Sequence, residues 1–98
     1  MPVLSFAGTA TGLIDKFVVH HNGSDLHKYD VSLNGNAKDQ PAECNNHEFW
    51  GDLTTEAGRA QYSMLLAAVM AGRSVQIDGQ SSCFHGREAI RNVRLIFK

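Results

Sequence analysis

Residues 55–71, TEAGRAQYSMLLAAVMA, decide the fold class, because they form the one convincing helix of the sequence. Thr54 or Thr55 can cap its start, since a hydroxyl oxygen accepts hydrogen bonds from the free N–H groups of the first turn. Gly72 follows directly and suits the left-handed conformation that ends many helices. From Met64 onward the segment is apolar on all sides, so it must be covered on more than one side. One side can pack against the domain's own sheet. The other side is expected to contact a partner, such as a second copy of the chain.

The segments before this helix are typical of strands and loops. Residues 12–21 are rich in β-branched and aromatic side chains, and residues 22–23 (Asn-Gly) are a strong hairpin signal. Residues 26–33 then form the returning strand, with one face more apolar than the other. Residues 36–46 are polar and contain a proline, which predicts a loop.

Further strands are predicted on both sides of the helix. Residues 47–53 form a short aromatic strand that we expect to be interrupted at Gly51. After the helix, residues 74–78 form a strand, Gly79 makes a turn, and residues 89–97 form the last strand, with an irregular register in its middle.

The order of strands, one central helix and more strands predicts a mainly β domain, a small Greek-key barrel of the OB type. Closing the sheet into a barrel also removes its exposed edges. A ferredoxin-like sandwich needs a second helix, and we find none in the sequence. With 98 residues, positions 1–98 are expected to form a single domain.

Composition argues against several classes of function. The hydrophobic fraction is 43%, the charged fraction is 19% and the formal net charge is −1, so the basic excess of a typical nucleic-acid-binding protein is missing. The longest apolar run, residues 64–71, is too short to span a bilayer, which predicts no membrane insertion.

Catalysis is not expected either. The sequence has no nucleophile elbow, no glycine-rich phosphate loop and no HExxH motif, and its acidic residues are scattered. We therefore predict no enzyme activity and no cofactor. His20 or His21 could join His27 across a hairpin, but a zinc site needs three or four ligands, so no metal site is expected.

Cys44 and Cys83 are the only cysteines, and they lie outside any CxxC spacing. In a short chain such a pair is more typical of a disulfide bridge than of a metal site. The alternative is a cytosolic protein with two buried free thiols. A bridge predicts a secreted or periplasmic protein, from which a leader has been removed and to which residues 1–2 (Met-Pro) were added.

From Cys44 onward the sequence resembles the binding (B) subunits of bacterial AB5 toxins, especially the branch with the subtilase cytotoxin and pertussis-like subunits. There a cysteine, an Asn-rich turn and a Trp-Gly lead into an alanine- and tyrosine-containing helix that ends in glycine and precedes a Val-x-Ile strand. The matching motifs are Cys44-x5-Trp50-Gly51, Gln61-Tyr62-Ser63-x-Leu65-Leu66-x-Ala68, Ala71-Gly72-x2-Val75-x-Ile77 and Cys83. The start of the first strand is similar too, in residues 11–14 (TGLI), so the resemblance covers roughly residues 9–77.

The resemblance implies an OB fold and a homopentameric ring whose helices line a central pore. Because residues 64–71 are apolar on all sides, we predict that Met64 and Ala68 lie on the oligomer or pore face of the helix. The resemblance also implies that a cell-surface glycan is the ligand and that a catalytic A subunit is a possible partner. One departure is that the subtilase-type subunits have a cysteine in the second strand, where this chain has Val31 or a neighbour.

The family's sialic-acid site uses a hydroxyl residue at the start of the first strand, and Thr11 falls at that place. Thr9 and the polar loop residues Asn36 and Lys38 could approach the same pocket. The resemblance therefore predicts a glycan site at Thr11, Thr9, Asn36 and Lys38. For each of the four residues, a solvated loop residue is the alternative, and Thr11 is the one for which the glycan role is favoured.

Two classes of function remain. The leading hypothesis is a non-catalytic, secreted, lectin-like B subunit of an AB5-type toxin that recognises sialylated cell-surface glycans through several copies of the site. The alternative is an OB-fold domain that binds single-stranded nucleic acid or another protein. A nucleic-acid binder needs a basic groove with aromatic side chains, which makes this alternative the weaker one.

Overall fold

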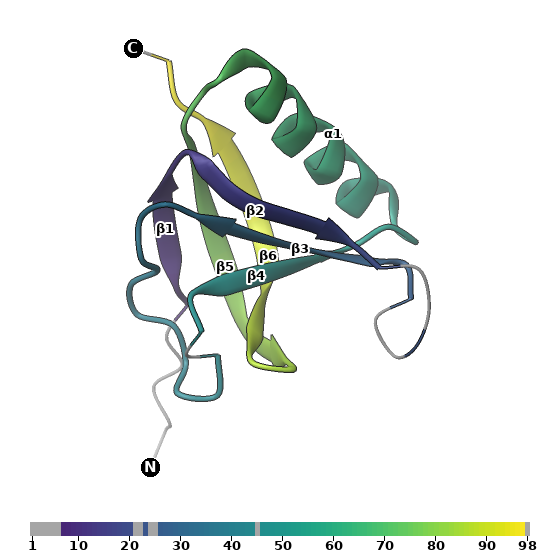
Figure 1. The fold of residues 1–98 in the computed structure, drawn as a ribbon. Coiled ribbons are helices and arrows are strands. Elements are labelled where there is room, and N and C mark those ends of the chain that lie inside the picture. The colour runs from purple at the N-terminus through teal and green to yellow at the C-terminus, as the bar shows by residue number, and fades with distance from the viewer. Residues whose placement is uncertain (1–6, 21–22, 24–25, 45, 98) are drawn as a thin grey trace.

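The computed structural model describes residues 7–20, 23, 26–44 and 46–97, and it shows a mainly β domain with one helix (Figure 1). The elements along the chain are β1 (Thr9–Gly12), β2 (Ile14–Val19), β3 (Lys28–Leu33), β4 (Glu48–Asp52), α1 (Glu56–Ala71), β5 (Val75–Phe84) and β6 (Arg87–Leu95). The strands form one sheet in the order β1-β5-β6-β4-β3-β2. Neighbouring strands are antiparallel except for β4 and β6, which run parallel.

The two strands at the edges of this sheet, β1 and β2, follow each other directly in the sequence. β1 and β2 are separated only by Leu13, so they are the two halves of one bent strand. At the bend Gly12 has a φ of 152°, which L side chains rarely adopt. The side chain of Asn34 accepts a hydrogen bond from the N–H of Leu13 at 3.1 Å. The sheet therefore curls into a small OB-type Greek-key barrel, and the predicted fold class is confirmed.

The predicted helix is confirmed at both ends. Thr55 is the N-cap, and its hydroxyl oxygen accepts a hydrogen bond from the N–H of Gly58 at 2.9 Å. Gly72 ends the helix in the left-handed conformation, with φ 64° and ψ 34°. α1 lies over one end of the curled sheet, and the loop after β3 and the β5–β6 hairpin lie at the other end (Figure 1).

Gly51 and Gly79 both lie inside strands. The predicted interruption of a strand at Gly51 and the predicted turn at Gly79 are therefore wrong. β4 runs through Gly51, where a Cβ atom would collide with the ring of Tyr29. β5 runs through Gly79, where a Cβ atom would collide with the carboxyl group of Glu88. These glycines make room for buried side chains of neighbouring strands. The expected irregularity of the last strand is confirmed, because Asp78 pairs with Asn92 whereas Gly79 pairs with Ile90.

The core lies between the curled sheet and α1. Tyr29 and Phe49 are its largest fully buried side chains. The rings of Phe17 and Tyr62 pack against Tyr29, with centroids 5.6 and 5.4 Å away. Burial raises the pKa of the Tyr29 hydroxyl group above its ordinary value.

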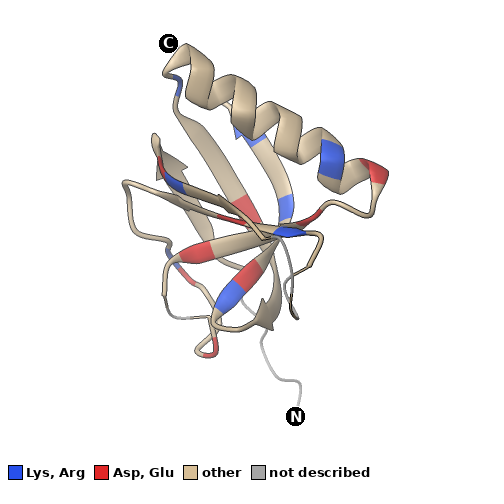
Figure 2. Cartoon of the chain, turned by 45° about the vertical axis from the view of Figure 1, so that its right-hand side comes forward, with Lys and Arg blue, Asp and Glu red and all other residues tan. Residues whose placement is uncertain are grey.

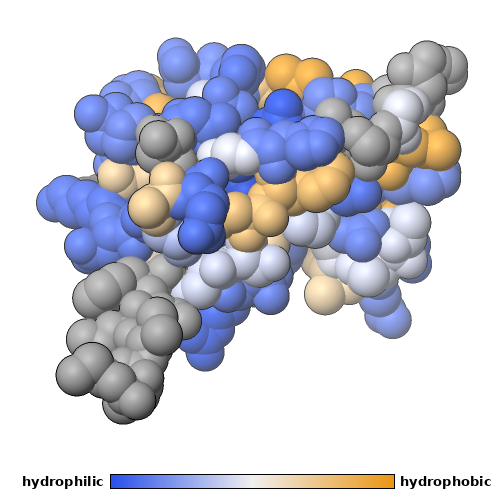
Figure 3. All heavy atoms as spheres, turned by 90° about the horizontal axis from the view of Figure 1, so that it is seen from below, coloured by the Kyte–Doolittle hydropathy of each residue, from blue (hydrophilic) through white to orange (hydrophobic). Residues whose placement is uncertain are grey.

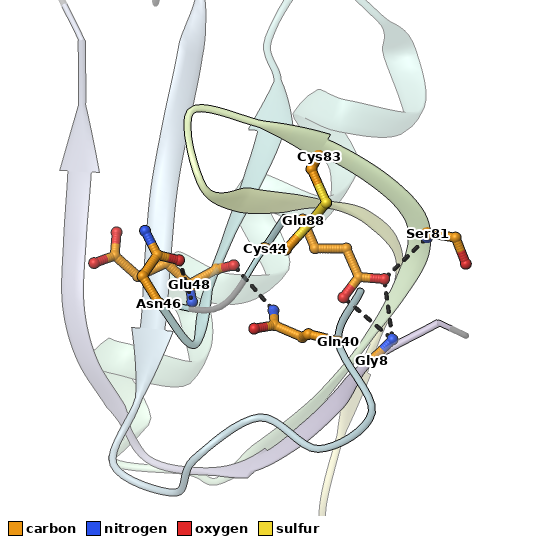
Figure 4. Close-up of a disulfide and its surroundings, with 8 residues drawn as sticks. All are labelled: Gly8, Gln40, Cys44, Asn46, Glu48, Ser81, Cys83 and Glu88. Atoms are coloured by element: carbon orange, nitrogen blue, oxygen red, sulfur yellow. Dashed lines mark hydrogen bonds between the residues drawn. A yellow bond between two sulfur atoms is a disulfide. The ribbon is translucent and has the colours of Figure 1, made fainter. Parts of the chain in front are cut away.

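A disulfide and a buried carboxylate close the end of the barrel opposite the helix (Figure 4). Cys44 and Cys83 are bridged with a Cα–Cα distance of 5.5 Å, so the predicted disulfide is confirmed. It ties the loop between β3 and β4 to β5. Glu88 is fully buried and accepts hydrogen bonds from the N–H groups of Gly8, at 3.0 Å, and Ser81, at 2.9 Å. These bonds hold the start of β1 against the far half of β5.

Candidate functional site

A hollow of about 400 Å³ lies between β1 and the loop that follows β3. Its volume falls within the range of roughly 300–1,000 Å³ that is typical of small-molecule sites. Two short segments supply the lining residues, which are Thr9, Ala10, Thr11, Gly35, Asn36 and Lys38. The structure thus brings together all four residues for which the resemblance predicts glycan contacts.

Backbone contacts fix the rim of this hollow. The N–H of Thr9 donates to the carbonyl of Lys38 at 2.9 Å, and the N–H of Lys38 donates to the carbonyl of Thr9 at 2.8 Å. Gly35 lies so close to the carbonyl of Thr11 that a Cβ atom would collide with it. The loop therefore lies along β1, and its position does not depend on a ligand.

The polar side chains of the hollow differ in the hydrogen bonds and the charge that they can present to a ligand. Thr11 is exposed, and its hydroxyl group has no partner among the residues that the structure describes, so it can both donate and accept. The hydroxyl of Thr9 donates to Asp78 Oδ1 at 2.9 Å, so toward a ligand it can only accept. The exposed ammonium group of Lys38, which makes no ion pair in the described part of the chain, adds positive charge to the rim.

Asp78 on β5 organises the polar side chains next to the hollow. Besides Thr9, its carboxylate accepts hydrogen bonds from Gln76 Nε2 at 3.0 Å and Asn92 Nδ2 at 2.6 Å, and it lies 3.4 Å from a guanidinium nitrogen of Arg94. Partial burial alone would raise the pKa of Asp78, but the three hydrogen bonds and Arg94 together outweigh this effect and lower it. Asp78 is therefore a stable anion at neutral pH, and four neighbours point toward it.

Two further hollows adjoin the first one at β1. One, of about 350 Å³, is lined by Thr9, Asp78, Asn92 and two arginines, Arg91 and Arg94, among others. The other, of about 330 Å³, lies at the opposite end of β1 beside Thr11 and Arg73. Each hollow thus carries at least one cationic side chain.

Sequence reasoning missed the β5 and β6 residues of this surface, although a signal for them exists. In residues 75–78 and 92–95, polar and apolar side chains alternate with the period of a half-buried strand. The alternation predicts Gln76, Asp78 and Arg94 on the outer face. It does not predict which strands lie side by side, because the sheet order depends on the closure of the barrel.

The helix residues predicted for a subunit interface lie mostly inside the domain. Ala68 is 1% exposed and belongs to the core, and the half-buried Met64 packs against the core. The large apolar side chains that α1 leaves exposed are instead Leu66, Val69 and Met70, which are 44%, 46% and 80% exposed. These three side chains lie on one face of the helix, because residues at i, i+3 and i+4 are neighbours on a helix.

The outer face of β3 and β4 is where OB folds commonly bind oligonucleotides. In this chain that face carries three carboxylates, those of Asp30, Glu48 and Asp52, and acidic and basic residues lie side by side on the strands (Figure 2). The half-buried Trp50 lies on the same face, and its ring centroid is 5.8 Å from that of Phe84 in the β5–β6 hairpin. The hairpin thus packs over part of this face.

Of the three histidines considered for a metal site, the structure describes His20 and His27. His20 Nε2 lies 2.5 Å from the buried carboxylate of Asp30, whereas His27 is exposed and His21 lies outside the described residues. Within the described residues, no three potential ligands from histidine, cysteine and acidic side chains lie close enough to hold a metal ion.

The face seen from below in Figure 3 is largely hydrophilic, and polar side chains break up its apolar areas. The helix in the described part of the chain is too short to cross a membrane. Comparisons of this chain with protein-family models, with curated proteins and with solved structures found no match. The geometry of the hollow and the resemblance of the sequence motifs are therefore the two features that point to a function.

Proposed function

We propose that the chain is a non-catalytic glycan-binding subunit of the kind found in bacterial AB5 toxins, and that it binds sialylated cell-surface glycans. The observation that carries this proposal is that Thr11, Thr9, Asn36 and Lys38 line one hollow. The disulfide between Cys44 and Cys83 supports a secreted or periplasmic location, because disulfides persist in oxidising compartments.

The hollow offers the chemistry that an acidic sugar needs. The hydroxyl of Thr11 donates to the sugar carboxylate, and Lys38 stabilises the same negative charge. The amide of Asn36 and the hydroxyl oxygen of Thr9 bind the hydroxyl groups of the sugar. Because the backbone already holds the rim in place, little ordering cost opposes binding.

Thr11→Ala should weaken the binding of a sialylated glycan more than tenfold. The reason is the loss of one hydrogen bond to a charged group, which costs about 1.5–3 kcal/mol. The measurement is calorimetric titration of the purified protein with sialylated and desialylated forms of one oligosaccharide.

The matched control is Ser82→Ala, which removes an exposed hydroxyl group on β5 away from the hollow. It should bind like the wild type. The proposal fails if the wild type does not distinguish the two oligosaccharides, or if Thr11→Ala binds as tightly as the wild type at unchanged oligomeric mass.

We further propose that five copies form a ring through α1, to which a catalytic A subunit can attach. The exposed face made by Leu66, Val69 and Met70 supports this, because an uncovered apolar helix face gains stability when a partner buries it. Charge supports it too, since after Arg59 no residue of the helix is charged (Figure 2). Several copies of a weak site would raise the affinity for a cell surface.

Met70→Glu should disperse this assembly. Light scattering of the wild type should give a mass near five times the 10.7 kDa of one chain, and the variant should give the mass of a single chain. Met70 is 80% exposed, so the folded domain itself should tolerate the change, which circular dichroism can check. Ala60→Glu, on the exposed side of the N-terminal half of α1, is the control. A monomeric wild type at micromolar concentration would contradict the ring.

The nucleic-acid alternative finds less support. The basic side chains of Lys16 and Arg87 beside the outer face of β3 and β4 form ion pairs with Glu48 and Asp30, so much of their charge is neutralised and less of it can attract a phosphate backbone. The hairpin side chain of Phe84 packs against Trp50, which would otherwise be the natural stacking platform on this face.

A further inference from the structure

Six polar side chains form a regular grid on the outer face of β1, β5 and β6. The strand register pairs them in two rows, since residues directly opposite each other share a face of the sheet. The rows are Thr9–Asp78–Asn92 and Thr11–Gln76–Arg94. The residues between them on the same strands, such as Ala10, Ile77 and Val93, are buried in the core. The grid is therefore the solvent side of a rigid, well-packed sheet.

Asp78 holds this grid in one arrangement. Its carboxylate accepts hydrogen bonds from Thr9, Gln76 and Asn92, and it pairs with Arg94. Each amide uses one N–H in this way, which leaves its carbonyl oxygen and its second N–H for a ligand. Fixed side chains with both donors and acceptors suit the hydroxyl groups of a sugar, because little rotamer entropy is lost on binding.

The hollow of about 350 Å³ beside the grid is cationic. Arg91 and Arg94 carry two positive charges, and Asp78 is the one negative charge among the lining residues. The guanidinium of Arg91 has no ion-pair or hydrogen-bond partner within the described ranges. Arg94 is 65% exposed and uses only part of its donors on Asp78. Guanidinium groups can bind a carboxylate or a sulfate through two parallel hydrogen bonds.

Thr9 connects this hollow with the proposed glycan site, because it lines both. β1 and β6 flank β5, so their side chains lie about 10 Å apart, two strand spacings. Two linked pyranose rings can span such a distance.

We propose that Arg91 and Arg94 form a second, anion-binding subsite, and that the ligand is an oligosaccharide with acidic groups on two neighbouring sugars. One acidic sugar binds at Thr11 and Lys38. The grid then binds the hydroxyl groups of the connecting region, and the second acidic group lies between the two arginines. This inference rests on the proposed function, since it extends the same site across β1.

The observations favour a glycan over a nucleic acid on this face. All six grid residues are polar and none is aromatic, so the grid has no platform on which a base could stack. Its amide and hydroxyl groups match the alternating donors and acceptors of a sugar instead.

The test compares four probes by calorimetric titration: the methyl glycoside of sialic acid, an α2,8-linked disialic acid, a sulfated chondroitin disaccharide, and an oligo-dT strand. The wild type should bind the disialic acid about tenfold more tightly than the single sugar, the gain expected from one further charged contact. The double variant Arg91→Gln/Arg94→Gln should lose this gain and keep the wild-type affinity for the single sugar. Lys16→Gln/Arg59→Gln, which removes two exposed charges from other faces, should behave like the wild type.

The outcomes separate the two proposals. If the wild type does not bind the single sugar, the proposed function fails. If it does, but the disialic acid gains nothing or its gain survives in the arginine variant, the second subsite alone is overturned. Binding of the sulfated disaccharide that depends on the arginines supports the subsite and identifies sulfate as its acidic group. Arginine-dependent binding of an oligo-dT strand without binding of any acidic sugar overturns both.

Discussion

Replacing Leu65 with alanine is expected to lower the free energy of unfolding by about 4 kcal/mol. Leu65 is fully buried on the face of α1 that packs against the sheet, and it belongs to the core cluster around Tyr29 and Phe49. Truncating such a leucine removes buried methyl groups and leaves a cavity, which costs roughly 3–5 kcal/mol. Urea denaturation followed by circular dichroism gives the difference, from the shift in midpoint at an unchanged slope.

Leu66→Ala is the matched control, since it makes the same chemical change one position further along α1. Leu66 is 44% exposed, so its truncation should cost less than about 1 kcal/mol at a concentration at which the chain is monomeric. Equal losses for the two variants would mean that α1 does not pack on the sheet with the face described.

Replacing both Cys44 and Cys83 with alanine is expected to cost roughly 4 kcal/mol, because the bridge closes a loop of 39 residues and restricts the unfolded chain. The folded variant should also exchange the amide proton of Lys38 faster, since the loop then loses its covalent tie to β5 and depends on non-covalent contacts such as its backbone bonds to Thr9. Urea denaturation and hydrogen exchange measure the two effects.

Reduced wild-type protein is the control for this pair of substitutions, and it should lose about the same stability. The intact mass after alkylation, with and without reductant, counts the free thiols. Two free thiols in the natively purified, oxidised protein would contradict the bridge.

The elements that could be predicted from the sequence are those with local signals. Thr55 and Gly72 mark the ends of α1 through capping chemistry that acts within a few residues. Gly51 and Gly79 misled the prediction, because a glycine in a strand has the same local signal as a glycine in a turn. Their role depends on Tyr29 and Glu88, which come from other strands and meet them only in the folded barrel.

In the candidate site, too, features with a local sequence signal could be predicted, and features that depend on contacts between distant strands could not. Thr11 and Lys38 came from a resemblance of sequence motifs, and the structure brings them to one hollow. The grid around Asp78 was missed because it needs the pairing of β5 with both β1 and β6, which no local pattern encodes. Ala68 was assigned to an outer face because the helix is apolar on nearly every side in this region, and only the packing of α1 on the sheet decides which side is buried.

The contact between Gly79 and Glu88 makes these two positions a coupled pair in evolution. Any side chain at position 79 would occupy the space of the Glu88 carboxyl group, so a relative with a larger residue there needs a shorter residue at position 88. That relative would also need a new acceptor for the N–H groups of Gly8 and Ser81, which Glu88 now binds. Substitutions at these positions should therefore occur together among relatives, and the start of β1 should change its sequence along with them.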